Sequence, residues 1–160
     1  MTVTQSPDPG FAETETHRMI RETAREVASN YDDDYWRTVT DEKRAPTEFW
    51  GDCADAGFLG TTVPEEYGGE GMGVQELVTV VEELVANGCL GAEMLFVVNV
   101  VFGAVTLTEH GSEEQKEELL RPLVEGDLKF CMALTEPNAG HNAPNMETFA
   151  DQQDDGSYLI

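Results

Sequence analysis

Basic residues are scarce in this sequence. Lys and Arg together number 9 against 32 Asp and Glu, which gives a net charge of −23 in 160 residues. Only three of the bases are lysines, and these are Lys43, Lys116 and Lys129. Because a nucleic acid is bound by a basic face that neutralises its phosphates, nucleic acid is not an expected partner.

Cysteines are few as well, and no signal peptide is visible. Cys53, Cys89 and Cys131 are odd in number and far apart, so they match no disulfide or metal-binding spacing. Free thiols are typical of a reducing compartment, which predicts a cytoplasmic protein. Residues 1–10 are polar, contain two prolines and lack the apolar core of a signal peptide, so we predict a flexible leader.

The acidic residues are spread along the whole chain and alternate with regular apolar positions. This distribution argues against disorder and against an acidic tail. At molar salt the Debye length is about 3 Å, so the repulsion between these carboxylates is screened. The composition therefore predicts a halophilic protein with one folded core, since a chain of about 150 residues buries roughly 70% of its unfolded surface.

Long apolar runs are limited to a single segment, 94–108, which lies between Glu93 and Glu109. Its 15 uncharged residues span about 22 Å as a helix, less than the roughly 30 Å of a bilayer core. We therefore predict a central buried helix and no membrane span.

Helical periodicity dominates the first 126 residues. Apolar residues at three- and four-residue steps predict a helix over 11–31, with Ile20, Ala24 and Val27 on its buried face. The same pattern predicts helices over 46–56, over 74–86 and after Ser112, which is placed as an N-cap. The expected fold is thus mainly α, with an all-helical domain over 11–126.

Five glycines and Pro64 fall within 58–73, so this segment is predicted to be a loop. A glycine-rich loop before a helix can cradle phosphate, but this one lacks the Lys-Ser/Thr ending of a phosphate-binding loop and carries three glutamates. A structural turn is the preferred interpretation, and a phosphate site is the alternative.

The pattern changes to short extended runs after Gly126. Residues 129–135 and 147–153 are read as strands, and Asp155-Gly156 predicts a hairpin turn before a third strand that begins at Tyr158. Because this third strand is cut short, we expect residue 160 to be a truncation point within a β-domain that starts near 127. A calcium loop beginning at Asp151 is a minor alternative for the turn.

The stretch from Phe130 to Asn142 is the best-marked candidate site, because an apolar run breaks there into Thr-Glu-Pro and a glycine-containing loop. Its Leu134-Thr135-Glu136-Pro137 and Ala139-Gly140, together with Val63-Pro64-Glu65-Glu66-Tyr67-Gly68-Gly69, resemble the N-terminal half of an acyl-CoA dehydrogenase. The two motifs stand in the right order, with a helical interval between them. The resemblance extends over nearly all of 11–160.

The resemblance implies a flavoenzyme with a helical domain, a middle β-domain and a C-terminal helical bundle. It would bind FAD and oxidise an acyl-CoA thioester between its α and β carbons, with an electron-transfer flavoprotein as acceptor and a homo-oligomeric assembly when full length. Carried onto this sequence, the flavin contacts fall on Met132, Leu134, Thr135, Gly140 and His141, and His141 also reaches the acyl-CoA. The catalytic glutamate of the family lies beyond residue 160.

Two departures follow Gly140. The family usually has Ser-Asp where this chain has His141-Asn142, which alters the side chain expected near the phosphates. With the base also outside the chain, we expect no dehydrogenase activity from these 160 residues alone, and weak or absent FAD binding. The alternatives are a non-enzymatic helical interaction module, which docks through 94–108, and a subunit of a split enzyme.

Overall fold

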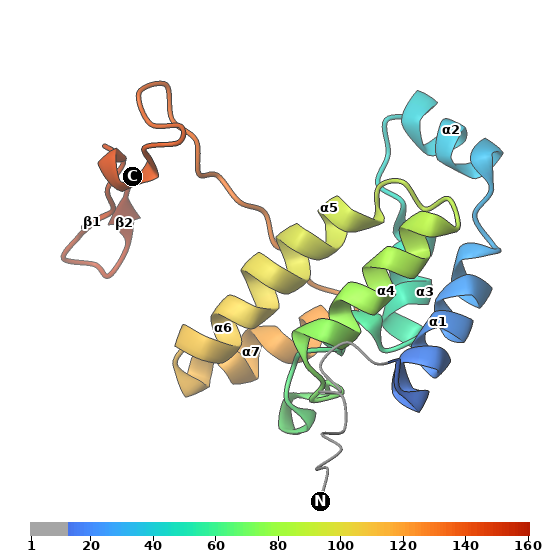
Figure 1. Cartoon of the computed structure of the whole chain (residues 1–160). Coiled ribbons are helices and arrows are strands. Elements are labelled where there is room, and N and C mark those ends of the chain that lie inside the picture. Colours follow the sequence, from blue (N-terminus) through green and yellow to red (C-terminus); the bar gives the residue numbers. More distant parts are fainter. Residues whose placement is uncertain (1–12) are drawn as a thin grey trace, which may run out of the picture. The chain divides into compact units, whose positions relative to one another are not determined.

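The computed structural model describes residues 13–160, and the predicted leader at 1–10 lies outside the described residues. The chain divides into two units, one ending at Phe130 and the other running from Cys131 to Ile160. The first is helical and the second contains a two-stranded antiparallel sheet (Figure 1). A mainly α fold with a small β part is therefore confirmed.

The helices are bounded as follows: α1 Glu15–Ala28, α2 Asp33–Asp41, α3 Thr47–Asp55, α4 Val74–Ala86, α5 Ala92–Phe96, α6 Thr106–His110 and α7 Glu113–Val124. A π-helical section, Val97–Val105, joins α5 to α6 without a break. Figure 1 shows α4 lying between α1 and the continuous helix from α5 to α6. These three elements pack together as the centre of the helical unit.

The predicted apolar faces are buried. Ile20, Ala24 and Val27 of α1 lie in the core, as do Phe49 and Trp50 of α3. Ser112 caps α7, because its hydroxyl accepts a hydrogen bond from the amide of Gln115 while the Gln115 side chain accepts one from the amide of Ser112. The reciprocal bonds form a capping box, so the prediction of an N-cap at this position is confirmed.

Helix α2 was not predicted. The sequence shows three aspartates where it begins, and by themselves these indicate only a polar segment after α1. In the structure the Asp32 carboxylate caps the helix by accepting from the amide of Tyr35, and the next two aspartates lie in the first turn. Only Val39 of this helix is buried, so the apolar period that marks a helix in a sequence is missing here.

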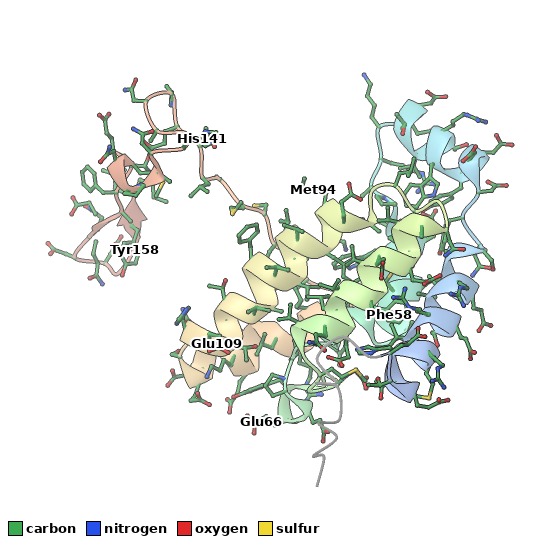
Figure 2. All side chains as sticks on the ribbon, viewed as in Figure 1. Phe58, Glu66, Met94, Glu109, His141 and Tyr158 are labelled. Atoms are coloured by element: carbon green, nitrogen blue, oxygen red, sulfur yellow. The ribbon has the colours of Figure 1, made fainter. Side chains whose placement is uncertain are left out.

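The apolar helix is longer and less buried than expected. It runs from Ala92 to His110, 19 residues, so its length and composition are sufficient for a membrane span and the exclusion on length was wrong. One face, with Phe96, Val100 and Ala104, has no exposed surface and packs in the core of the helical unit. The other face, which includes Met94 near the start of the helix, is exposed (Figure 2).

The C-terminal unit forms fewer strands than predicted. Strand β1 is Asp151–Gln152 and strand β2 is Tyr158–Leu159, paired antiparallel across the turn at Asp155 and Gly156. Gly156 has φ +84°, which favours glycine, and the hairpin prediction is confirmed. Residues 129–135 form no strand, because no second strand within 13–160 pairs with them.

Candidate functional site

Residues 131–135, directly after Phe130, form an open segment that belongs to no helix or strand. Within residues 13–160, none of their amide or carbonyl groups forms a hydrogen bond. Met132 and Leu134 are 47% and 44% exposed, although both side chains are apolar. Unpaired backbone beside exposed apolar side chains has the character of a sheet edge that is available to a partner strand or a ligand.

Thr135 ends this segment with an exposed hydroxyl that has no hydrogen-bond partner among the described residues. A threonine at such a position can hydrogen-bond to the backbone of its own turn, but the Thr135 hydroxyl forms no such bond among the described residues. A hydroxyl next to two exposed apolar side chains offers one donor and two acceptor lone pairs to a planar heteroaromatic ring. Of the five residues predicted to contact a cofactor, Thr135 therefore has the most suitable chemistry.

Glu136 closes the turn that follows. Its amide donates to Ala139 O (3.0 Å) and the Ala139 amide donates back to Glu136 O (3.2 Å), which leaves Pro137 and Asn138 as the loop. Its carboxylate accepts from the amides of Glu147 and Thr148 at 2.8 and 2.9 Å. A hydrogen bond from the Thr148 side chain, together with these amides, lowers the pKa of Glu136. Glu136 is thus an acid that stabilises the turn through these hydrogen bonds.

Gly140 and His141 are exposed at the end of the turn. A Cβ at Gly140 would meet no atom within 4 Å, so nothing inside the unit requires glycine there. The Gly140 amide donates to Asn142 Oδ1 at 3.0 Å, and the His141 side chain has no hydrogen-bond partner among residues 13–160. The Asn142 side chain therefore already accepts from the Gly140 amide, a backbone donor next to the expected phosphates.

The glycine-rich loop 58–73 has no free amide for a phosphate between Tyr67 and Gly73. Six of these amides donate to backbone carbonyls of the same loop, and the amide of Gly73 donates to the Glu76 carboxylate. A Cβ at Gly69 would lie 2.1 Å from Val63 O, and Gly68 has φ +89°. Both glycines are required by a compact turn, so the structural interpretation of this loop is supported.

The loop is also attached to α7. The Tyr67 hydroxyl donates to the Glu113 carboxylate at 2.9 Å, and Arg121 donates to Glu66 O at 3.3 Å. The hydrogen bond to Glu113, together with burial, raises the pKa of Tyr67 to about 12. These contacts hold one of the two sequence motifs as part of the helical scaffold.

The hairpin turn has the same structural character. Asp155 accepts hydrogen bonds from the amide and the hydroxyl of Ser157 at 2.9 and 2.6 Å. A hydrogen bond from the Ser157 hydroxyl, its largest cause, lowers the pKa of Asp155. The carboxylate is thus committed to its own turn, which favours the hairpin interpretation over the calcium loop. Among residues 13–160, no cluster of His, Cys, Asp and Glu is arranged to hold a metal ion.

An apolar groove was missed by the sequence analysis. It has a volume of about 340 Å³ and lies between α4 and the helix that contains the π-helical section. Its lining is apolar except for one glutamate: Val74, Leu77, Val78, Val81, Glu82, Phe96, Val97 and Val101. The signal was present, because Val74, Val78 and Val81 continue the apolar pattern of α4 onto a second face.

His17 links the starts of two helices. Its Nδ1 accepts from the amide of Thr14, so the proton of the neutral ring is placed on Nε2, which lies 3.2 Å from Glu76 Oε1. Glu76 in turn accepts from the amide of Gly73 before α4. The contact connects the N-termini of α1 and α4.

Comparison with known proteins identifies the class. A family model described as acyl-CoA dehydrogenase, N-terminal domain, matches residues 14–127. Acyl-CoA dehydrogenase FadE12 of Mycobacterium tuberculosis is 33% identical over 153 residues, which are 96% of this chain and 39% of that protein. The chain therefore belongs to the acyl-CoA dehydrogenase family, and it spans about two fifths of the length of this relative.

Solved structures agree with the sequence relatives. The acyl-CoA dehydrogenase of Bacillus anthracis, determined in complex with FAD, superposes with a TM-score of 0.82 at 27% identity and covers 94% of this chain and 26% of its own. A chain in the structure of the electron transferring flavoprotein of Acidaminococcus fermentans gives a TM-score of 0.81 at 32% identity, over 91% of this chain and 38% of that one. The helical unit thus has the fold of the family's N-terminal domain.

Proposed function

We propose that this chain is the N-terminal part of an FAD-dependent acyl-CoA dehydrogenase and provides one wall of its flavin site. The observation that carries the proposal is the open segment 131–135, with its unpaired backbone, exposed Met132 and Leu134, and free Thr135 hydroxyl. These groups fit the edge of a planar, partly polar ring. The family membership of the helical unit supports FAD as that ring.

The residues of this chain would bind and orient the flavin and the thioester. The chemistry would be supplied by the cofactor and by groups outside this chain. FAD, when bound, would supply the hydride acceptor that α,β-dehydrogenation of the thioester needs. Met132 and Leu134 would pack against the ring, and Thr135 would hydrogen-bond to its polar edge. Proton removal at the α carbon requires a base, and the family's glutamate for that step is not in this sequence.

Gly140 and His141 are proposed to lie near the phosphates of FAD and of the acyl-CoA. Asn142 Oδ1 already accepts from the Gly140 amide, so a phosphate oxygen has to displace it before this donor can be used. His141 is exposed and unpaired within residues 13–160, and it replaces the serine hydroxyl that the family usually presents. We therefore expect weaker phosphate binding here than in relatives with Ser-Asp.

The proposal extends to domains and partners. We propose a helical domain over 11–126, a middle β-domain that starts near 127, a homo-oligomeric full-length enzyme and a cytoplasmic location. Electron-transfer flavoprotein is the proposed electron acceptor, supported by the similarity to a chain in the Acidaminococcus fermentans structure. The acyl group oxidised is proposed only as far as its class, a CoA thioester.

A hybrid protein tests this function. Residues 1–160 are joined to the part of FadE12 that follows its matched region, and FadE12 itself serves as the positive control. The hybrid is expected to hold FAD with a flavin absorption band in the visible range that acyl-CoA bleaches, whereas the isolated chain is not bleached. A hybrid that folds cooperatively but retains no FAD would overturn the proposed function.

A second candidate function rests on the apolar groove between α4 and the long helix. In a split enzyme, the remaining domains arrive as a separate chain, and this groove would receive an apolar helix from them. Val78 is 57% exposed within the groove, so Val78→Asp should weaken that association without unfolding the chain. Sedimentation of the chain with the separately expressed FadE12 remainder measures it. Equal association of both variants contradicts this role for the groove.

A further inference from the structure

We infer that Asn99 is a positioning residue that fixes the start of the proposed flavin wall; the inference rests on the proposed function. Asn99 is 4% exposed and lies in the π-helical section, among valines. Its Oδ1 accepts a hydrogen bond from the amide of Phe130 at 2.7 Å, and its Nδ2 donates to Leu95 O at 2.9 Å. Both ends of the buried amide are therefore paired.

The ring of Phe130 packs against Gly103, which lies four residues after Asn99 in the same helix. A Cβ at Gly103 would lie 2.5 Å from Phe130 Cδ2, a distance that requires the ring to move. Phe130 is thus held twice, by its amide at Asn99 and by its ring against the backbone at Gly103. The ring can lie this close to the helix backbone because residue 103 has no side chain.

The chain is also fixed just before Phe130. The Trp50 indole Nε1 donates to Gly126 O at 2.9 Å, and Lys129 Nζ lies 5.4 Å from the Trp50 ring. Gly126 has φ +82°, and a Cβ there would lie 3.0 Å from Ala54 Cβ. We call this set the exit anchor: Trp50, Asn99, Gly103, Gly126 and Phe130.

The exit anchor ends where the backbone becomes unpaired. Phe130 is the last residue before the segment 131–135, whose backbone forms no hydrogen bond within residues 13–160. Met132 follows two residues later, so its Cα lies within about 7.6 Å of the Phe130 Cα. The position of Phe130 therefore limits where Met132 and Leu134 can lie against a flavin.

A polar residue at position 99 has an energetic cost that this bond offsets. Burial of an amide among valines is unfavourable unless its hydrogen bonds are made. Leucine has the same number of side-chain heavy atoms with the same branching, but it would leave the Phe130 amide without an acceptor in a partly buried place. The Asn99 side chain is thus explained by the exit segment more than by the core.

Amide hydrogen exchange of the 160-residue chain tests the anchor. In Asn99→Leu, protection of the Phe130 amide should fall about tenfold, as expected for loss of one hydrogen bond, with less than about twofold change at the Leu120 amide. Asn99→Asp keeps an oxygen for Phe130 and, with its carboxyl protonated, also a donor for Leu95 O, so it should restore most of the protection at acidic pH. Thr106→Ala, an exposed change in the same helix, is the control and should alter neither amide.

Gly103→Ala tests the same anchor from the other side, because its methyl group would displace the Phe130 ring. It should raise Phe130 exchange even if Asn99→Leu fails to fold. Unchanged Phe130 protection in a folded Asn99→Leu or Gly103→Ala variant overturns the inference.

The flavin role is tested in the hybrid with FadE12. Asn99→Leu should weaken FAD binding about tenfold and alter the shape of the flavin absorption band, and Asn99→Asp should recover both when its carboxyl is protonated. If the unsubstituted hybrid folds but holds no FAD, the proposed function and this inference both fail. If it binds FAD and Asn99→Leu binds equally well with the same spectrum, only the inference fails.

Discussion

The helical unit and the C-terminal unit differ in how they are stabilised. Phe49, Leu84 and Phe96 of the helical unit have no exposed surface, whereas Ala139 is the single buried apolar residue within 131–160. The C-terminal unit is shaped instead by turns and by carboxylates that accept from backbone amides, as at Glu136. The first unit contains its own core, and the second has side chains available for contacts with something else.

Charge follows the same division. All nine Lys and Arg residues lie in 13–130, whereas 131–160 contains five acids and neither Lys nor Arg. The ion pairs of the described chain are accordingly confined to the helical unit, and the one with the most buried carboxylate joins Glu83 to Arg21 and Arg25. The contrast between the units can therefore be tested by substitution, by salt and by thiol chemistry.

Removing an aromatic side chain from the core should show directly that the two units differ in how they are stabilised. Phe96→Ala leaves a cavity in the helical unit and should lower the free energy of unfolding by about 3–5 kcal/mol. Leu134→Ala removes a side chain that is 44% exposed and should change it by less than about 0.5 kcal/mol. Urea unfolding followed by tryptophan fluorescence measures both. Similar losses for the two variants would contradict the contrast.

Loss of the buried Glu83 carboxylate should have the next largest effect on the free energy of unfolding. Glu83 accepts from Arg21 and Arg25 at 2.7 Å, and Glu83→Gln should cost about 2 kcal/mol at neutral pH, because Arg25 loses its anion and Arg21 is left with the more exposed Glu13 and Glu82. Glu82→Gln is the matched control. Glu82 pairs with the same Arg21 but is 60% exposed, so its loss should cost less than about 0.5 kcal/mol.

The same pair of variants gives a pH test. Burial raises the pKa of Glu83, but hydrogen bonds from Arg21, Asn87 and Arg25 outweigh it and hold the pKa below its usual range. A depressed folded pKa gives stability that is present above the unfolded value of about 4.3 and is lost as the pH falls through the folded value. Glu83→Gln should therefore flatten the acid side of the stability curve, and an unchanged slope counts against this role.

Salt should have a smaller effect on the whole chain. If the acidic surface is halophilic, potassium chloride at about 2 M should stabilise the protein relative to about 0.1 M by about 1 kcal/mol, which is roughly 4 °C in melting temperature. A thermal scan monitored by circular dichroism at both concentrations is sufficient. Equal melting temperatures would refute the halophilic interpretation.

Thiol reactivity should separate the units without altering stability. Burial raises the pKa of Cys89 to about 11 and also raises the pKa of Cys53, whereas Cys131 is exposed. Ellman's reagent should therefore modify one thiol rapidly and the other two only after unfolding. Cys131→Ser should remove the fast phase. Rapid modification of two thiols in the folded protein is the contrary result.

The sequence predicted most of the helical unit because each of its long helices buries a regular stripe. It missed α2, where Asp32 signals a cap but only Val39 is buried, so that the signal was local and not periodic. It placed a strand at 129–135 from side-chain pattern alone. A strand also needs a hydrogen-bonding neighbour, and none exists for this segment within the described chain.

The candidate site could be predicted only in part. The motif located the turn, and the structure adds that the Glu136 carboxylate stabilises it by accepting from the amides of Glu147 and Thr148. The motif did not show that Asn142 occupies the Gly140 amide, because that bond depends on loop geometry. Nor did it reveal Asn99, which reads as one polar residue within an apolar helix until Phe130 is seen beside it.

The compact turn at Gly69 has a consequence for how such chains are recognised. Even a methyl carbon at this position would lie 2.1 Å from Val63 O, so the turn in this conformation requires glycine. The glycine therefore reflects the demands of the helical scaffold and carries no information about chemistry. A match to the motif around it thus indicates the fold, and evidence of dehydrogenase chemistry has to come from other residues.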